Sequence, residues 1–349
     1  MEDKSKKFLN DLLNSNSPSG FEKQTSQLYR DYIAPYCDVS VDILYNTVAV
    51  INPEAEIKIL IDAHLDEIGM QITYIHEDGF LFFRKVGGID PAIMPGSEVI
   101  ILSGRGEVSG IIGKKPIHLQ RVEDFRTPLR LDDLCIDIGV DSRKKAKELV
   151  SVGDYITLKP NVQMLNEYRI VSKALDDKIG VYVLAEVMKK LSSKKLKVGV
   201  YGVASAQEEV GSKGIKIQAN KIRPQYSICI DVGFASDVYN VKEKEVSRFC
   251  LGFGVGINHS TDTNLEFTRR LKEIAIKNDI LFQPIVPISP TGGTNTSSIQ
   301  LSNEGVITAL VSIPCRYIHS PVEMCDMRDV ESAISLLTET ILAIDKDYL

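Results

Sequence analysis

Histidine and carboxylate side chains that follow short apolar segments are the residues of this chain best suited to metal chemistry. His64 follows the apolar run 59–63, and Asp66 lies two residues further on. A histidine ring can bind a metal ion through one nitrogen while a carboxylate accepts the N–H of the other, which fixes the tautomer. His64 is therefore a candidate ligand, and Asp66 a candidate orienting residue. Considered alone, the pair also suits a partly buried histidine beside a loop carboxylate.

Two pairs of adjacent carboxylates add to this set. Asp176 and Asp177 stand where a strand pattern gives way to a helical pattern, and Glu208 and Glu209 follow the apolar run 197–204. One carboxylate can bridge two metal ions, and another can take a proton from a water that a metal ion has acidified. Aspartate is also a common helix N-cap, and adjacent glutamates are common on solvated helices, so neither pair is specific by itself.

Asp231 and His319 complete the set, since each lies at or after the end of another expected strand. A lone acid at the end of a buried strand is costly unless it is paired, caps a helix or binds a metal. His319 could instead be a loop histidine hydrogen-bonded to the backbone. Four successive expected strands end in a histidine or a carboxylate, at the edge where open α/β sheets bind ligands. This inventory of nitrogen and oxygen ligands, without thiolate, is typical of a two-metal hydrolase.

The elements that would position these residues alternate between strands and helices. Strands are expected at 57–63, 169–174, 197–204, 226–231 and 306–312, and helices at 176–191, 261–278 and 327–343. The stretch 70–166 differs, because its short strands are closed by Gly and Pro turns, which predicts a small β-barrel or sandwich. We therefore predict an α/β fold with a mainly parallel sheet flanked by helices, formed by residues 1–69 and 167–349 and interrupted by this β-rich insert.

Composition narrows the classes of protein that the chain could belong to. At 349 residues it exceeds the usual size of a single core, which predicts two domains. The net charge is −6 with dispersed Lys and Arg, so no nucleic-acid surface is expected. No apolar stretch is long enough to span a bilayer, and the N-terminal residues do not read as a signal peptide. The six scattered cysteines suit reduced thiols, so we expect a cytoplasmic protein without membrane partners.

The ordered motifs indicate a family. Over essentially its whole length the chain resembles the tetrahedral, dodecamer-forming metallo-aminopeptidases, whose members include glutamyl and deblocking aminopeptidases and some proteins labelled endoglucanases. The motifs that carry the resemblance are Ser19-Gly20-Phe21-Glu22, the segments around His64 and Asp176, Gln207-Glu208-Glu209-Val210-Gly211, Gly292-Gly293-Thr294 and Arg316-Tyr317-Ile318-His319-Ser320-Pro321.

The resemblance implies a role for each candidate residue. The two implied ligand sets share one residue: His64, Asp176 and Asp231 for one metal ion, and Asp176, Glu209 and His319 for the other. Glu208 would be the catalytic base, and Asp66 would orient His64. Two divalent ions are expected per subunit, zinc first, with cobalt or manganese also compatible with these ligands. The insert would be a dimerisation domain, and the subunits would assemble into a dodecamer.

The implied reaction is hydrolysis of the N-terminal peptide bond of short peptides. A hydroxide bridging the two metal ions would attack, and Glu208 would take the water proton and return it to the leaving amine. The main alternative is a related dinuclear amidohydrolase, such as a carboxypeptidase or an N-acyl-amino-acid deacylase. A non-catalytic scaffold with the same fold is a second alternative. Polysaccharide hydrolysis is disfavoured because the chain has no Trp.

Two positions need separate comment. Asn295 follows Gly292-Gly293-Thr294, where the family usually has Asp, so one negative charge is missing. If this side chain lies near the substrate, we expect altered specificity or affinity for the free amino group. His118 lies in the segment 113–119, which also matches a family pattern, and we expect it in a structural or interface position and not among the ligands.

Overall fold

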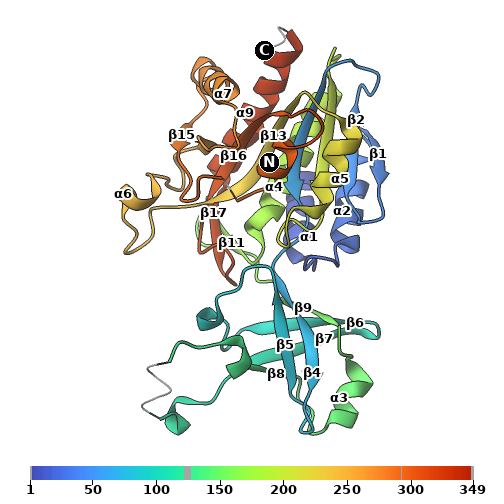
Figure 1. Cartoon of the computed structure of the whole chain (residues 1–349), viewed down its shortest axis with the longest axis vertical. Helices are drawn as coiled ribbons and strands as arrows, with labels where there is room; N and C mark the ends of the chain where they lie inside the picture. Colours follow the sequence, from blue (N-terminus) through green and yellow to red (C-terminus); the bar gives the residue numbers. More distant parts are fainter. Residues whose placement is uncertain (1, 122–126, 292, 347–349) are drawn as a thin grey trace.

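A computed structural model of the chain describes residues 2–121, 127–291 and 293–346. These residues form a large sheet flanked by helices and a smaller β-barrel, which lies below the sheet in the view of Figure 1. The predicted fold class, an α/β structure with an inserted barrel, is confirmed. Gly292 of the Gly-Gly-Thr motif lies outside the described residues.

The main sheet has 11 strands within the described residues. Along its main path they follow the order β1 (Asp38–Val41), β2 (Thr47–Ile51), β12 (Gly199–Ser205), β3 (Lys58–His64), β13 (Tyr226–Phe234), β16 (Ile307–Arg316), β17 (Glu323–Asp326), β11 (Arg169–Ser172) and β10 (Gln163–Met164). A branch is formed by β14 (Val255–Asn258), which pairs with β16 and with β15 (Phe282–Ile285). The four central strands β12, β3, β13 and β16 are parallel, so their carboxyl ends meet at one edge.

Helices cover both faces of this sheet, which explains why its central strands are almost continuously apolar. The larger core includes side chains from α1 (Asp3–Asn14), α2 (Lys23–Ile33), α4 (Leu175–Ser192), α7 (Leu265–Lys277) and α9 (Met327–Lys346). The smaller core includes side chains from α5 (Lys213–Ile222) and α8 (Thr296–Gln300). Strand β3 feeds both, since Ile59 and Ile61 lie in the larger core and Leu60 in the smaller. The short helix α6 (Glu243–Val246) has no buried residue.

The insert is a closed barrel, which decides between the two forms that the sequence predicted. Its strands follow the order β4 (Gly69–Ile75), β5 (Leu81–Val86), β8 (Cys135–Asp137), β7 (Gly106–Gly113), β6 (Glu98–Ser103) and β9 (Tyr155–Leu158), and β9 pairs again with β4. It has its own apolar core. Helix α3 (Arg143–Leu149) and the turns η1 (Pro91–Ile93), η2 (Ile117–Leu119) and η4 (Leu131–Asp133) complete it.

Several element boundaries differ from the expected ones for local reasons. The helix expected at 261–278 begins at Leu265, because Asn264 is its N-cap and accepts a hydrogen bond from the N–H of Phe267 at 3.0 Å. The last strand of the parallel set continues to Arg316 instead of ending at 312, because it also pairs with β17. No helix in the described ranges is long and apolar enough to cross a membrane.

Candidate metal centre

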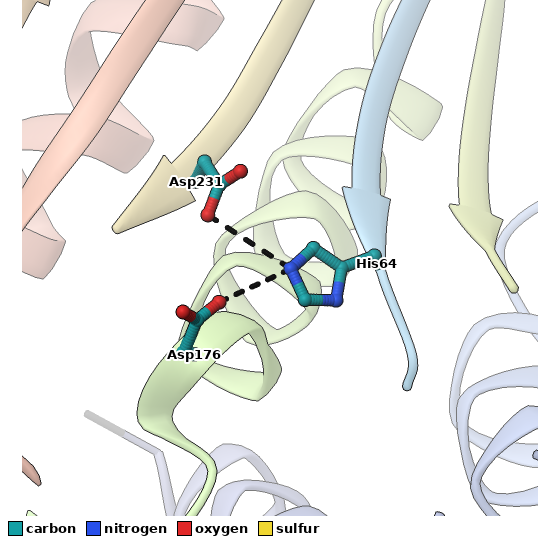
Figure 2. A group of neighbouring side chains, drawn as sticks. All are labelled: His64, Asp176 and Asp231. Atoms are coloured by element: carbon teal, nitrogen blue, oxygen red, sulfur yellow. Dashed lines mark hydrogen bonds and ion pairs between the residues drawn. The ribbon is translucent and has the colours of Figure 1, made fainter. Parts of the chain in front are cut away.

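All six residues predicted for the metal ligands and the base lie at one edge of the parallel strands. His64 is the last residue of β3, and Asp231 lies near the end of β13. Asp176 lies at the start of α4, and Glu208, Glu209 and His319 occupy the loops that follow β12 and β16. Figure 2 shows the ring of His64 directed between the carboxylates of Asp176 and Asp231. The tertiary fold thus brings together segments as distant in sequence as residues 64 and 319.

The five candidate ligands form two groups that share Asp176. In the first, His64 Nε2 lies 3.1 Å from Asp176 Oδ1 and 3.9 Å from Asp231 Oδ1 (Figure 2). In the second, His319 Nε2 lies 3.3 Å from Asp176 Oδ2 and 3.1 Å from Glu209 Oε1. Within each group the candidate ligand atoms all lie within 4.8 Å of one another. The two oxygens of Asp176 therefore face two different histidines.

The centre carries more buried carboxylate than the chain itself can neutralise. Among the described residues, the ion pairs of Asp176, Asp231 and Glu209 are all with His64 or His319, and none is with Lys or Arg. Burial raises the pKa of Asp231 to about 8 and the pKa of Glu208 to about 9. Acids in such surroundings need an added positive charge to ionise together. The donor set and its charge therefore fit divalent cations.

The neighbouring carboxylates favour the protonated, positively charged form of both histidines. Burial lowers the pKa of His319, but its hydrogen bonds to Asp176 and Glu209 outweigh burial and raise the pKa to about 11. Burial likewise lowers the pKa of His64, while hydrogen bonds to Asp176 and Asp66 raise it well above its usual value. Without a cation the two rings hold protons as counter-charges. A bound metal ion would take over that role, and its binding would release protons.

Asp66 contacts both halves of the site, but in a different way from the one predicted. His64 Nδ1 lies 3.0 Å from the main-chain oxygen of Asp66 and 3.6 Å from Oδ1 of its carboxylate. The carboxylate accepts hydrogen bonds from the N–H of Glu208 at 2.9 Å and of Glu209 at 3.1 Å, and from the hydroxyl of Ser19 at 2.5 Å. Asp66 thus contacts the ring of His64 through its main-chain oxygen and, at the longer distance, through its carboxylate, which also binds the glutamate loop.

Two further carboxylates, whose contacts sequence reasoning missed, hold the main chain of the candidate ligands. Asp177 accepts a hydrogen bond from the N–H of His64 at 3.1 Å. Glu323, at the start of β17, accepts from the N–H of Asp176 at 2.9 Å and of His319 at 2.8 Å. The sequence contains only a weak signal for Glu323, namely an acidic residue in the short segment between Pro321 and the following helix.

The backbone around the centre is unusual at three positions. Ala174, Gln207 and His319 have positive φ values of 54°, 59° and 62°. Such conformations cost a non-glycine residue of order 1–3 kcal/mol and persist where the surroundings hold them. The site also restricts the residue type at Gly180, in the first turns of α4, because a Cβ there would lie 2.2 Å from Asp177 Oδ1. The close approach of Asp177 therefore requires glycine at this position.

Asn295 lies beneath the centre. It is 3% exposed, and its amide donates to Asp62 Oδ2 at 2.7 Å and to the hydroxyl of Ser205 at 3.0 Å. Asp62 precedes His64 by two residues on β3, and Ser205 ends β12. A carboxylate at position 295 would face the carboxylate of Asp62, so the amide suits this neighbour. The expected link between Asn295 and substrate specificity assumed a position near the substrate, and these buried contacts lie instead with the strands.

The barrel also reaches the centre. A cavity of about 490 Å³ adjoins His319, with Lys85, Ile89 and Asp90 on the barrel side and Tyr317 and Ile318 on the other.

His118 is exposed in the turn η2 and belongs to neither ligand group.

Comparison with known proteins agrees with this geometry. Residues 46–336 match the family described as M42 glutamyl aminopeptidase. A lysyl aminopeptidase from Pyrococcus furiosus is 33% identical over 329 residues, which cover 93% of each chain. The crystal structure of a TET aminopeptidase from a marine sediment archaeon of the Thaumarchaeota aligns with a TM-score of 0.94 and 30% identity over 98% of this chain and 97% of that one.

A second solved structure adds information on assembly in a relative. The TET1 peptidase of Pyrococcus horikoshii, which can assemble into a tetrahedron or a large octahedral shell, aligns with a TM-score of 0.87 and 33% identity over 96% of this chain and 98% of that one. The family match covers most of the chain and includes every candidate ligand. The chain therefore belongs to the M42 family of peptidases, and it is a hydrolase of the aminopeptidase type.

Proposed function

We propose that the chain removes the N-terminal residue of short peptides with the help of two divalent cations and with Glu208 as the general base. The observation that carries this proposal is the position of Asp176, whose two carboxylate oxygens face His64 and His319 separately. A carboxylate placed in this way can connect two metal ions. Family membership supports metal dependence, and the surplus of buried carboxylates supports more than one positive charge.

In this proposal each cation has three protein ligands, with zinc as the first expectation and cobalt or manganese as compatible ions. The ligand sets are His64, Asp176 and Asp231 for one ion, and Asp176, Glu209 and His319 for the other. When bound, the two cations would polarise the scissile carbonyl group and acidify a water molecule.

Glu208 is proposed to take the water proton and deliver it to the leaving amine. The N–H groups of Glu208 and Glu209 both donate to the carboxylate of Asp66, which holds the main chain of the two glutamates in place. Burial raises the pKa of its carboxyl to about 9, and nearby positive charge would lower the pKa toward the range in which a carboxylate acts as a base. Glu208 is not needed as a ligand, so its carboxyl is available for proton transfer.

The test of this role is Glu208→Gln, which keeps the shape of the side chain and removes its basicity. We expect turnover of an aminoacyl-nitroanilide to fall by at least roughly 10²–10⁴-fold while two metal ions stay bound. Substantial activity in the metal-loaded variant would reject the role. An N-acetylated substrate separates the proposal from the deacylase alternative, because an aminopeptidase needs the free α-amine.

We further propose that residues 1–69 and 167–349 form the catalytic domain and that residues 70–166 form a dimerisation domain of a dodecamer. The assembly of the Pyrococcus horikoshii relative supports a shell-forming oligomer. The barrel also exposes large apolar side chains at Ile111, Ile117 and Leu119. Light scattering on the purified protein would measure the mass directly, and a stable monomer would reject this assembly. The cytoplasmic location stays a prediction.

A further inference from the structure

The candidate metal centre is surrounded by buried carboxylates that bind its main chain. Of the six site residues, five donate their backbone N–H to such a carboxylate: His64 to Asp177, Asp176 and His319 to Glu323, and Glu208 and Glu209 to Asp66. The sixth, Asp231, lies in β13 opposite Ser312 of the neighbouring strand β16. The ligands are thus positioned by hydrogen bonds that do not use their own side chains.

Glu323 differs from the other two carboxylates because it joins the shared ligand to a ligand of one ion only. Its Oε2 accepts from Asp176 and its Oε1 accepts from His319, and the side chain is 2% exposed. The two N–H groups come from segments 143 residues apart, at the start of α4 and in the loop between β16 and β17. His319 also has a positive φ of 62°, so its conformation depends on such an external contact.

Both oxygens of Glu323 are therefore already engaged with the backbone. Glu323 belongs to neither group of candidate ligands, and in the described part of the chain it forms no ion pair with Lys or Arg. Lys173 and Lys178 interact with Glu323 electrostatically at longer range, and the hydrogen bonds that its oxygens accept come from the two backbone N–H groups, which points to a positioning role.

We propose that Glu323 is a positioning residue that sets the separation between His319 and Asp176 and so forms the site of the second cation. This inference rests on the proposed two-cation function. His319 Nε2 lies 3.3 Å from Asp176 Oδ2. The backbone N–H groups of the same two residues both donate to the carboxylate of Glu323, which holds the two main chains at a fixed separation. Loss of one bond frees the loop of His319, whereas His64 and Asp231 keep their own supports.

The test is Glu323→Gln, which preserves size but turns one acceptor into an NH₂ donor that faces a backbone N–H. Asp329→Asn is a matched control, because Asp329 is also fully buried and accepts two backbone hydrogen bonds, from Gly252 and Gly254 at 2.7 Å each, away from the candidate ligands. Metal-free wild type and both variants are titrated with Co²⁺, and binding is followed by visible absorption and by metal content after dialysis.

We expect wild type and Asp329→Asn to bind two ions per chain with similar affinities. In Glu323→Gln we expect the ion held by Asp176, Glu209 and His319 to lose roughly 10- to 100-fold in affinity, with a changed absorption band, while the other ion changes less. Excess Co²⁺ should restore part of the activity. Equal affinities for both ions in wild type and Glu323→Gln would overturn the inference, as would an equal loss in Asp329→Asn.

The metal content of wild type separates this inference from the function on which it rests. If wild type itself binds fewer than two ions, the two-cation proposal fails first. If Glu323→Gln does not fold, Glu323→Asp replaces it, since it keeps both acceptor oxygens on a side chain one methylene shorter. A measurable weakening of the second ion in the folded Glu323→Asp variant supports the inference, and an unchanged affinity overturns it.

Discussion

Two buried clusters of charge lie close together in this protein, and they are neutralised in different ways. The first is the candidate metal centre at His64. The second, which we call the Glu67 cluster, consists of Glu67, Lys173 and Lys178, all at most 2% exposed. Lys173 Nζ lies 2.7 and 2.6 Å from the two oxygens of Glu67, and Lys178 Nζ lies 3.3 Å from one of them. The Glu67 cluster contains two lysines, whereas the ion pairs of the metal centre within the described residues are with histidines alone.

The pKa values of Glu67 and of Asp231, one carboxylate from each cluster, are therefore shifted in opposite directions. Burial raises the pKa of Glu67, but Lys173 and Lys178 outweigh burial and hold the pKa below its usual value. Burial raises the pKa of Asp231 to about 8, because no lysine or arginine opposes it. Burial also lowers the pKa of Lys178 to about 7, so this cluster can balance its charge by releasing one proton. Burial of a carboxylate alone is thus not evidence of a metal site, whereas several buried carboxylates that outnumber their cationic partners are.

The Glu67 cluster also joins the two parts of the molecule. Lys173 donates to the hydroxyl of Thr157, on barrel strand β9, at 2.9 Å, and Lys178 donates to the main-chain oxygen of Ser15 at 2.8 Å. The N–H of Ser17 donates to Glu67 at 2.7 Å. A balanced cluster can serve as a permanent connection between barrel and sheet, while an unbalanced one needs a ligand.

The largest expected effect is on the stability of the Glu67 cluster. Lys173→Met leaves Glu67 with the longer contact to Lys178, which still compensates part of its charge, so we expect a loss of about 3 kcal/mol, the lower end of the cost of breaking a buried pair. Lys178→Met should cost clearly less, because Lys173 still contacts both oxygens. Urea unfolding of the two variants measures the difference. Equal losses would mean that the two lysines share the charge of Glu67 evenly.

In the metal centre, replacing an acid by its neutral amide should stabilise the metal-free protein instead of destabilising it. Without metal, burial raises the pKa of Asp231 to about 8, so folding at neutral pH requires this carboxyl to take up a proton. Asp231→Asn removes that cost, and we expect it to be more stable than metal-free wild type by about 1–3 kcal/mol. With excess Zn²⁺ the order should reverse, because wild type gains stability from binding. Thermal unfolding with chelator and with Zn²⁺ measures both orders. Asp231→Asn that is less stable in both conditions would contradict the proposed need for added positive charge.

Asn295 tests the same idea on a smaller scale. Asn295→Asp would place two carboxylates together beneath His64, and we expect a loss of about 1–2 kcal/mol. The exchange Asp62→Asn with Asn295→Asp should recover at least half of this loss, as contacting residues couple in a double-mutant cycle. A panel of aminoacyl substrates should give unchanged relative rates. A changed preference would show instead that position 295 influences the substrate.

The smallest expected change is in the pH dependence of the Glu67 cluster. The pKa of Glu67 is lowered on folding, so its ionised form stabilises the folded state above the unfolded pKa, near 4.5. This contribution is lost as the pH falls through the folded pKa. The difference in unfolding free energy between wild type and Glu67→Gln should therefore shrink as the pH falls below 4.5 through the folded pKa. A difference that grows toward acid pH would contradict the ion pairing.

Much of the candidate site could be predicted because its residues follow recognisable strands. The apolar run before His64, the helix after Asp176 and the strand before Glu208 all have the boundaries, within a few residues, that local patterns indicate. Parallel strands bring their carboxyl ends to one edge, so the convergence of His64 and Asp231 could be expected from the sequence. The family motifs then related the candidates to one another.

The residues that hold the site in place could not be predicted, because their contacts have no local pattern. Glu323 contacts a backbone N–H 147 positions away, and Asp66 contacts one 142 positions away. An acid in sequence does not reveal whether it will meet a backbone N–H, a lysine or a metal ion. Glu67 and Asp66 are adjacent, and yet one pairs with lysines and the other accepts backbone hydrogen bonds.

The sequence by itself thus determined the secondary structure, the candidate ligands and the family, because periodicity and motif spacing depend on neighbours along the chain. Only the tertiary structure decided that the insert closes as a barrel, that Asn295 faces Asp62, and that in the described residues one buried acid cluster pairs with histidines and the other with lysines. These outcomes depend on which polar groups meet in space after burial. The free energy of a buried charge is set by those neighbours and not by the residue type.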